Sequence, residues 1–362
     1  MTTQAPIRVG VIGGGIGRLH LNSYQQLGKA VKITALCDVD EDRLQEIGDT
    51  YNVPLRYTKV EDLFSSGEVD AVSICTPNNL HAPLSIAALE AGLHVLCEKP
   101  LAHSVAEGQK IVEAANQARG KFMICYNRRY RPDIQWIRKM LDEAALGQVY
   151  QVKAGWIRED GIHGGWFAQK ELSGGGPLID LGVHILDALM WLLDFPQPLT
   201  ISGDVQANFG PRQAKFNRSS WRRSALSEFT VEDSATAFIR LAGGIKVMFE
   251  VSWASHARPG QDDIYLSVMG TAGTADLYIQ NYANENTLTF YTEVGGTPVT
   301  LRPATRGNGY DHAYAIAEFI RCIQEDIPPA ASAEKGLVIL QMIEAIYRSA
   351  KLGREVTLPD VP

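Results

Sequence analysis

The stretch that decides the fold is Val9-Gly10-Val11-Ile12-Gly13-Gly14-Gly15-Ile16-Gly17. Its apolar first half is typical of a β-strand that is buried on both faces, and the glycines after it allow a sharp turn into a helix. The N-terminus of such a helix offers backbone N–H groups to a phosphate. We therefore predict a dinucleotide site whose pyrophosphate is bound by Gly13, Gly15, Ile16 and Gly17. The third glycine comes one residue earlier than in the standard fingerprint.

Strand-like and helix-like runs alternate from this turn to residue 126. The strand-like runs are short, apolar and rich in β-branched residues, at 7–12, 33–37, 71–75, 94–97 and 122–125. Amphipathic helical runs lie between and after them, near 17–28, 40–50, 79–91 and 103–118. Alternating βα units with right-handed crossovers predict a Rossmann domain, with a doubly wound parallel sheet, over residues 1–127.

The pattern changes after Tyr126. Alternating apolar and polar residues predict a strand at 150–158 and several more strands between 199 and 302, as in a sheet with one covered face. Helices are expected near 131–145, 177–193, 309–325 and 333–350. We predict that residues 128–362 form an α+β domain with a largely antiparallel open sheet.

The composition restricts the class of protein. The chain has 362 residues, of which 45% are hydrophobic and 21% are charged, which suits two domains with sizeable cores. The net charge of −7 argues against a nucleic-acid partner, which would need a basic face. No apolar run reaches the roughly 18 residues of a membrane span, and the first residues lack the pattern of a signal peptide. We expect a cytoplasmic protein.

The five cysteines form no CxxC pair, which fits a reducing compartment. Four of them end predicted strands, namely Cys37, Cys75, Cys97 and Cys125. These four could share a layer and bind a metal, but a role as small buried apolar residues explains them better. No metal site is predicted.

Asp38 ends the second strand, about 20 residues after the glycine turn, where a carboxylate accepts hydrogen bonds from the adenosine ribose. The same charge would repel a 2′-phosphate, which favours NAD over NADP. The alternative role of Asp38 is to cap the next helix. Arg43 on that helix is either a cover for the adenine or a solvated surface charge.

The segment after strand 71–75 reads Thr76-Pro77-Asn78-Asn79-Leu80-His81. Ligands of doubly wound sheets bind at the carboxyl ends of the strands, so Thr76 and Asn78 are predicted to line the nucleotide. His81 either faces the cofactor or caps a helical turn.

One lysine directly follows the next apolar strand, in Val95-Leu96-Cys97-Glu98-Lys99-Pro100-Leu101. Pro100 restricts the backbone of Lys99, and a cis peptide bond is possible there. An ammonium at the carboxyl end of the sheet can stabilise an alcohol oxygen as it becomes negatively charged. A surface lysine after a strand is the alternative.

Asp180 and His184 stand four residues apart in a predicted helix and so share a face. A neutral imidazole is a natural proton acceptor near neutral pH, and Asp180 could orient a substrate hydroxyl or tune the histidine. Asp187 is near enough in sequence to hold the histidine too. A buried histidine satisfied by an aspartate is the plainer alternative, but the glycines at 174–176 favour close approach of a ligand.

With these motifs in place, the chain resembles the glucose–fructose oxidoreductase/inositol dehydrogenase/MocA family over nearly its whole length. The resemblance rests on the glycine turn, Thr76-Pro77-Asn78 with His81, Glu98-Lys99-Pro100, Tyr126-Asn127-Arg128-Arg129 and residues 174–184. It implies a Rossmann domain followed by an α/β domain whose open sheet builds dimers or tetramers. It implies a nicotinamide cofactor, with Glu98 and Asn127 among its contacts, and a lysine, an aspartate and a histidine at the reacting carbon. Those roles fall on Lys99, Asp180 and His184.

A glycine-rich loop with aromatic residues precedes the predicted catalytic helix. Aromatic faces suit the C–H faces of a sugar ring, and the loop resembles that of members that act on sugars, anhydrosugars or inositols. The predicted substrate contacts are Arg131, Arg158, His163 and Trp166, with Tyr310 and His312 as weaker candidates.

The sequence thus predicts an NAD-dependent dehydrogenase of a secondary hydroxyl of a sugar or cyclic polyol. One alternative keeps the cofactor but not the net redox change: transient oxidation of a sugar would permit elimination of a glycoside or epimerisation. The other is a non-enzymatic protein that senses NAD or a sugar, against which the Lys99, Asp180 and His184 set argues.

Overall fold

The computed structural model describes residues 5–212, 228–307 and 311–358. They form two compact units, one comprising Met1–Asn127 with Tyr310–Leu337 and the other Arg128–Gly309 with Val338–Pro362. Tyr310, a weaker substrate candidate, lies outside the described residues.

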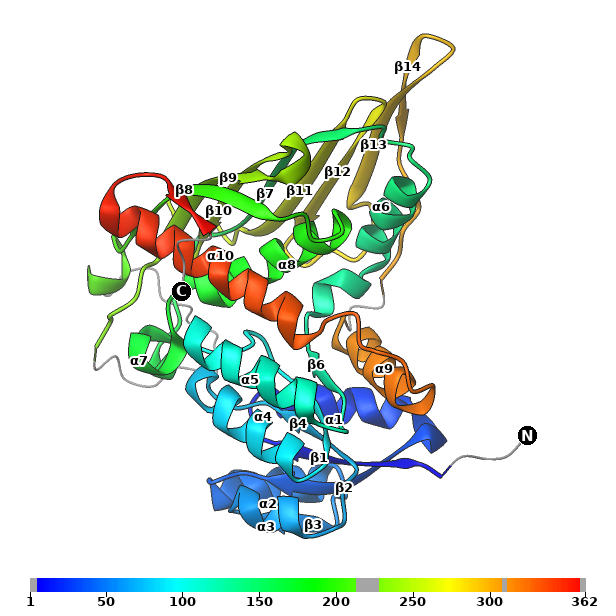
Figure 1. The fold of residues 1–362 in the computed structure, drawn as a ribbon, viewed down its shortest axis with the longest axis vertical. Coiled ribbons are helices and arrows are strands. Elements are labelled where there is room, and N and C mark those ends of the chain that lie inside the picture. The colour runs from blue at the N-terminus through cyan, green and yellow to red at the C-terminus, as the bar shows by residue number, and fades with distance from the viewer. Residues whose placement is uncertain (1–4, 213–227, 308–310, 359–362) are drawn as a thin grey trace. The chain divides into compact units, whose positions relative to one another are not determined.

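The first unit contains a parallel sheet in the order β3-β2-β1-β4-β5-β6 among the residues described (Figure 1). The strands are β1 (Ile7–Ile12), β2 (Val31–Cys37), β3 (Leu55–Tyr57), β4 (Ala71–Ile74), β5 (His94–Cys97) and β6 (Phe122–Ile124). The helices between them are α1 (Gly17–Gln26), α2 (Glu41–Thr50), α3 (Val60–Ser65), α4 (His81–Glu90) and α5 (Val105–Gln117). This order reverses direction between β1 and β4, which is where nucleotide ligands bind in doubly wound sheets.

Apolar side chains fill the centre of this sheet, because its strands are covered on both faces. Val9 and Val11 on β1 and Val72 and Ile74 on β4 have no exposed surface. The helix α9 (Asp311–Gln324) also belongs to this unit and packs against α1. The predicted Rossmann sheet is confirmed. The sequence did not reveal β3 or α3, because β3 is a three-residue edge strand with only half-buried side chains.

The second unit is built on a mixed, mostly antiparallel sheet in the order β14-β13-β12-β11-β7-β10-β9-β8-β15 in the part of the chain that is described. Its strands are β7 (Val149–Arg158), β8 (Pro198–Gln206), β9 (Ser234–Leu241), β10 (Lys246–Ser252), β11 (Asp262–Gly270), β12 (Gly273–Gln280), β13 (Leu288–Val294), β14 (Thr297–Leu301) and β15 (Val356–Thr357). Only β7 and β10 pair in parallel among these strands. The predicted α+β architecture is confirmed, with β14 and β15 as edge strands that the sequence did not reveal.

Helices cover one face of this sheet (Figure 1). They are α6 (Pro132–Asp142), α8 (Val183–Leu192) and the later residues of α10 (Ala333–Leu352), while the short α7 (Lys170–Ser173) precedes α8. The alternation along β10 shows the two faces: Val247, Phe249 and Val251 are buried, whereas Met248 between them is 50% exposed. The stretch Lys170–Leu192 has the length and apolar composition of a membrane span, but 94% of its most apolar window is buried inside the protein, as in a core helix.

Candidate functional site

The glycine turn after β1 has little room for side chains. Gly13 has a φ of +94°, and a Cβ there would collide with the carbonyl group of Cys75. Gly17 begins α1, and a Cβ on it would press on Val11. Gly15 is exposed and Ile16 is half-buried at the helix start, so the backbone there is open to a ligand. The turn therefore fits a pyrophosphate, which needs close approach to backbone N–H groups at a helix N-terminus.

Asp38 is held rigidly beside this turn. Its carboxylate accepts hydrogen bonds from the backbone N–H of Gly14 at 2.6 Å and of Asp40 at 2.9 Å, and from Arg43 Nη2 at 2.6 Å and Nε at 2.9 Å. Burial opposes its ionisation, but these hydrogen bonds outweigh burial and lower the pKa of Asp38. The N-cap of α2 is Asp40, which accepts a hydrogen bond from the N–H of Arg43. Asp38 is thus a charged acceptor beside the glycine turn, and Gly14 is a contact that the GxGxG pattern did not single out.

The segment after β4 is tied to the segment of Lys99. His81 is fully buried, with Nδ1 2.7 Å from the carbonyl oxygen of Pro100 and Nε2 3.1 Å from that of Thr76. Burial lowers the pKa of His81, which favours its neutral form. Asn78 is also buried at this strand end. Lys99 is half-buried after β5, and the bond from Lys99 to Pro100 is cis, as the sequence allowed. His81 therefore connects the segment after β4 to the segment after β5, at the carboxyl ends of these strands.

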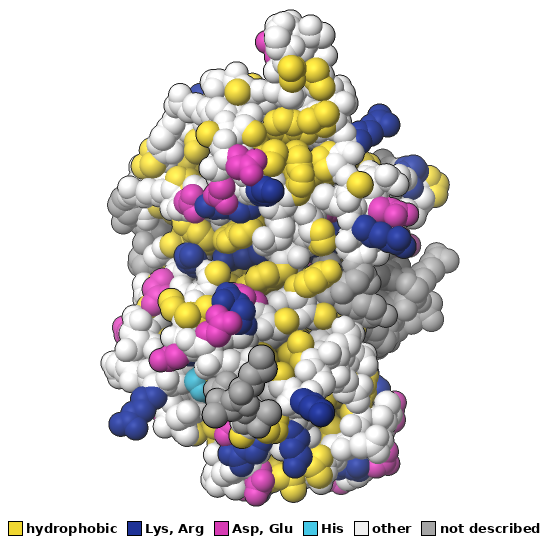
Figure 2. All heavy atoms as spheres, turned by 90° about the vertical axis from the view of Figure 1, so that its right-hand side faces the viewer, with side chains coloured by type: hydrophobic (Ala, Val, Ile, Leu, Met, Phe, Trp, Pro, Cys, Tyr) yellow, Lys and Arg dark blue, Asp and Glu magenta, His cyan; other side chains and the backbone are white. Residues whose placement is uncertain are grey.

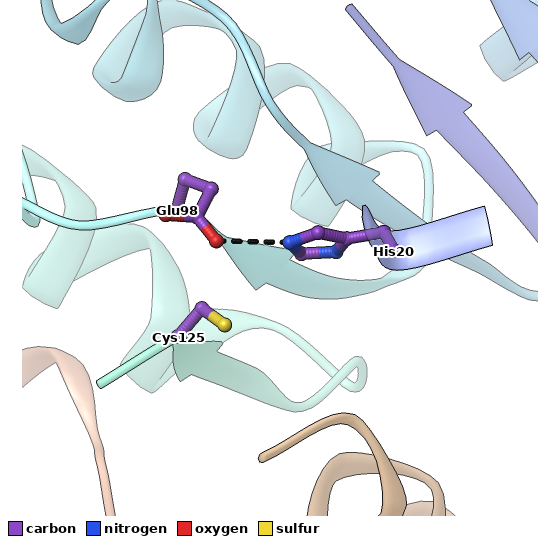
Figure 3. A group of neighbouring side chains, drawn as sticks. All are labelled: His20, Glu98 and Cys125. Atoms are coloured by element: carbon purple, nitrogen blue, oxygen red, sulfur yellow. Dashed lines mark hydrogen bonds and ion pairs between the residues drawn. The ribbon is translucent and has the colours of Figure 1, made fainter. Parts of the chain in front are cut away.

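A hydrogen-bonded group surrounds Glu98 (Figure 3). His20 Nε2 lies 2.9 Å from Glu98 Oε1, and His20 Nδ1 lies 3.0 Å from the hydroxyl of Ser73. His312 on α9 places Nε2 3.6 Å from the same carboxylate and Nδ1 3.3 Å from the side-chain amide of Asn127. Burial works against ionisation of Glu98, but the hydrogen bond from His20 and the nearby positive charge keep its pKa well below the usual range. The structure thus joins Glu98 and Asn127 through His312, which the sequence associated with substrate.

His20, Glu98 and Cys125 place three potential metal-ligand atoms within 4.8 Å of one another. A metal ion there would have to replace the His20–Glu98 hydrogen bond and take a deprotonated thiol. Burial raises the pKa of Cys125 well above its usual value, and the neighbouring Glu98 charge acts in the same direction. Hydrogen bonding within the group therefore explains these residues better than a metal does.

In the second unit, polar side chains converge on Asp180. Its Oδ2 accepts a hydrogen bond from Trp253 Nε1 at 3.0 Å. His163 Nε2 lies 3.7 Å and Arg158 Nη1 3.9 Å from the same oxygen. All of these side chains are buried or nearly so, so the interactions are poorly screened by water. Trp253 is a contributor that sequence reasoning missed, because a tryptophan in a strand-rich region resembles any other core residue.

The Arg158 guanidinium is fixed on several sides. Its Nε lies 3.0 Å from Asp262 Oδ2, and its Nη2 donates to the Tyr282 hydroxyl at 2.7 Å. The guanidinium also stacks over the Trp156 indole, with the Arg158 Cζ 4.9 Å from the ring centroid. The guanidinium of Arg128 lies at the same distance, 4.9 Å, from the Trp156 ring. These contacts leave the charge of Arg158 close to Asp180 in a fixed orientation.

His184 is the second residue of α8, which begins at Val183 directly after a π-helical turn, Leu178–Gly182, that contains Asp180. π-Turns inside α-helices are frequent at functional sites because they redirect side chains. The ring of His184 lies 5.8 Å from that of Trp156, centroid to centroid. The sequence predicted a regular α-helix over 177–193, whereas the structure has a π-helical turn at its start.

Three other candidates make contacts of their own. Arg131 forms an ion pair with Asp133 at 2.8 Å and donates to the carbonyl of Ala283 at 3.1 Å. Trp166 is half-buried and stacks on Phe167, with ring centroids 3.8 Å apart. Asp187 accepts hydrogen bonds from Arg129 Nε at 2.7 Å and Nη2 at 2.5 Å. The structure therefore groups Arg158 and His163 with Asp180, and it gives Arg131 a different set of partners.

The glycines before α8 have a packing role. Gly174 ends α7 with a φ of +84°. A Cβ on Gly175 would overlap the hydroxyl of Tyr347, and one on Gly176 would overlap the carbonyl oxygen of Glu232. The sequence interpretation linked these glycines to approach of a ligand, but close packing within the unit is sufficient to require them.

Comparison with known proteins places this geometry in a family. Residues 7–126 match the family described as "Oxidoreductase family, NAD-binding Rossmann fold", and residues 134–276 match the GFO/IDH/MocA C-terminal domain. The chain is 30% identical over 359 residues to the D-glucoside 3-dehydrogenase of Escherichia coli K12, covering 98% of this chain and 99% of that protein. It is 32% identical over 361 residues to a putative UDP-kanosamine synthase oxidoreductase subunit of Amycolatopsis mediterranei, covering 96% and 97%.

A solved structure of levoglucosan dehydrogenase in complex with NADH shares the fold, with a TM-score of 0.86 at 21% identity over 99% of each chain. The matched Rossmann family and the glycine turn together establish a nicotinamide dinucleotide as the cofactor class. The chain belongs to the glucose–fructose oxidoreductase/inositol dehydrogenase/MocA family of oxidoreductases.

Proposed function

We propose that the protein is an NAD-dependent dehydrogenase that oxidises a secondary hydroxyl of a sugar, anhydrosugar or inositol. The observation that carries the proposal is the Asp180 carboxylate, held by Trp253 with Arg158 and His163 beside it, one turn before His184. Buried carboxylates and guanidinium groups with an aromatic ring nearby suit a polyhydroxylated ring, which needs both hydrogen-bond partners and an apolar surface. The names of relatives, such as D-glucoside 3-dehydrogenase and levoglucosan dehydrogenase, support the same substrate class.

Oxidation of a hydroxyl group gives Lys99, Asp180 and His184 one proposed role each. The bound nicotinamide supplies the site that accepts or returns a hydride. We propose that His184 takes the hydroxyl proton and that the Lys99 ammonium stabilises the oxygen as negative charge develops on it. Asp180 orients the hydroxyl. In the reverse direction the same groups polarise a ketone and return the proton.

The preference for NAD rests on Asp38. Its lowered pKa keeps it ionised at neutral pH, where it can accept hydrogen bonds from ribose hydroxyls and repel a 2′-phosphate. The remaining proposed cofactor contacts are Gly13, Gly15, Ile16, Gly17, Arg43, Thr76, Asn78, His81, Glu98 and Asn127. The proposed substrate contacts are Arg131, Arg158, His163 and Trp166.

We also propose a homo-oligomer in the cytoplasm. The uncovered face of the nine-stranded sheet exposes large apolar side chains, including Met248, Tyr278 and Tyr291. Figure 2 shows hydrophobic side chains gathered in the upper part of the view. Val294, the last residue of β13, is 65% exposed. Exposed apolar patches of this kind are typical of protein interfaces. The five cysteines are buried free thiols, which suits a reducing compartment.

The test is turnover with a panel of glycosides, anhydrosugars and inositols, with NAD⁺ and NADP⁺ compared. Reduced nicotinamide should form together with a keto product. Turnover of a glycoside with no net reduced nicotinamide would favour the redox-neutral alternative, in which the keto-sugar is transient. Dinucleotide binding without turnover of any substrate would favour a sensing protein.

A further inference from the structure

A buried carboxylate meets the start of the helical segment that carries Asp180. Glu232, which precedes β9, is 7% exposed. Its Oε1 accepts hydrogen bonds from the backbone N–H of Gly176 at 2.9 Å and of Leu178 at 3.1 Å. The first N–H groups of a helix have no partner within the helix, so a buried helix start needs an acceptor of this kind. Glu232 supplies it from a distant part of the chain.

A tyrosine completes this contact. The hydroxyl of Tyr347 on α10 donates to the same Glu232 oxygen at 2.9 Å. The close approach depends on glycine, because a Cβ at position 175 or 176 would overlap the Tyr347 hydroxyl or the Glu232 carbonyl. Glu232, Tyr347 and the start of the segment therefore form one packed contact.

The neighbouring residue holds Asp180 from its other side. The carbonyl oxygen of Asp233 accepts a hydrogen bond from the backbone N–H of Trp253 at 2.9 Å, and the indole of Trp253 donates to Asp180 Oδ2. The backbone N–H of Asp180 donates to the carbonyl of Gly176 at 2.9 Å. Glu232 is thus linked through Gly176 to the backbone of Asp180, and Asp233 is linked through Trp253 to its carboxylate.

We propose that Glu232 is a positioning residue for the reaction, which sets the place of Asp180 and His184 through the start of their helical segment. The inference rests on the proposed function, because it assigns Glu232 to the same chemistry. Without an acceptor, two buried N–H groups lose their partner and the segment must shift to recover one. A shift of about 1 Å in a catalytic group can lower the rate about 100-fold.

The test compares three variants in the full-length protein. Glu232→Met has a similar length but no acceptor, and Glu232→Gln keeps a carbonyl oxygen for the two N–H groups. The control is Ser349→Ala, at a buried residue on the same helix as Tyr347. The Ser349 hydroxyl accepts from Gly203 N–H at 2.9 Å and donates to the Arg354 carbonyl at 2.7 Å, so this variant loses buried hydrogen bonds away from residues 174–184.

We expect Glu232→Met to lower kcat about 100-fold, with KM for the dinucleotide within about twofold of wild type, and Glu232→Gln to recover most of kcat. Ser349→Ala should lower the melting temperature and leave kcat unchanged.

Retention of full kcat by a folded Glu232→Met protein would overturn the inference, as would an equal loss of kcat in Ser349→Ala. If Glu232→Met does not fold, Tyr347→Phe decides: a fall in kcat at unchanged dinucleotide KM supports the role, and unchanged kcat refutes it. Inactive wild-type protein would instead count against the proposed function.

Discussion

The indole N–H of Trp253 donates a hydrogen bond to the Asp180 carboxylate at 3.0 Å. The bond holds one oxygen of the Asp180 carboxylate, Oδ2, in place. Trp253 has no exposed surface and directly follows β10 in the chain. The tryptophan thus links a strand of the sheet to the helical segment that carries the proposed catalytic residues.

Replacing this donor should impair catalysis selectively. In Trp253→Phe the ring is retained but the N–H is lost, and a hydrogen bond to a charged group is worth about 1.5–3 kcal/mol. We expect kcat/KM for the sugar to fall about tenfold to 100-fold, with dinucleotide affinity unchanged. Steady-state kinetics and a binding titration measure the two effects. The matched control is Trp136→Phe, whose ring packs edge-on against Phe290 elsewhere in the unit, and a similar loss there would contradict this role.

The cofactor preference should depend on Asp38. Asp38→Ser removes the carboxylate and releases Arg43 to meet a 2′-phosphate. The ratio of kcat/KM for NAD⁺ to that for NADP⁺ should fall about tenfold to 100-fold, since both hydrogen bonding and charge change. Asp40→Ser is the control, because it removes a carboxylate 3.1 Å from Arg43 and keeps a residue suited to the N-cap of α2. An unchanged ratio in Asp38→Ser would disprove the assignment.

Lys99 should matter for chemistry more than for binding. Lys99→Met removes the ammonium, and loss of one electrostatic contact to a developing oxyanion lowers kcat about 100-fold to 1000-fold. NADH binding, followed by fluorescence, should persist. Lys121→Met, which removes a lysine paired with Asp326 at 2.7 Å, should keep wild-type kcat. A fully active Lys99→Met protein would point to a non-catalytic role for this residue.

The stability of the protein should respond to pH through Glu232. Burial raises the pKa of Glu232, although hydrogen bonds from Gly176, Leu178 and Tyr347 oppose the shift. A carboxyl group with a raised folded-state pKa contributes stability below its unfolded pKa of about 4.3, and this contribution is lost as pH rises through the folded pKa. The free energy of unfolding of Glu232→Gln minus that of wild type should therefore increase as pH rises from 4 to 8, because only the wild-type protein loses this contribution. Urea unfolding across this range measures it, and a difference that does not vary with pH would rule out the raised pKa.

The group of His20, Glu98 and Cys125 should bind no metal in the purified protein. The short His20–Glu98 contact and the protonated thiol leave no ready set of ligands. Elemental analysis should find well under one zinc ion per chain, and a chelator should leave activity intact. Stoichiometric zinc that disappears in Cys125→Ser would contradict this interpretation.

The sequence was sufficient to predict the two folds, because strand patterning and the glycine turn are local signals. It also placed Asp38 at the end of the second strand, where the structure finds it beside the glycine turn, but it did not predict that Arg158 and His163 lie next to Asp180. The edge strand β3 was missed because its three residues bury too little surface to show a pattern. The link between Glu232 and Gly176 spans 56 positions, and no periodicity reports contacts of that kind. The π-turn at Asp180 was missed for a similar reason, since a regular helix and a π-turn have the same composition.

The reaction itself tests most directly whether the protein is an NAD-dependent dehydrogenase of sugars or polyols. Purified protein is mixed with NAD⁺ and each member of a panel of glycosides, anhydrosugars and inositols, while the absorbance of reduced nicotinamide and the sugar products are followed. We predict that at least one compound yields reduced nicotinamide and a keto-sugar in equal amounts. No absorbance change with any compound, together with no binding of NAD⁺ or NADH by titration, would contradict it.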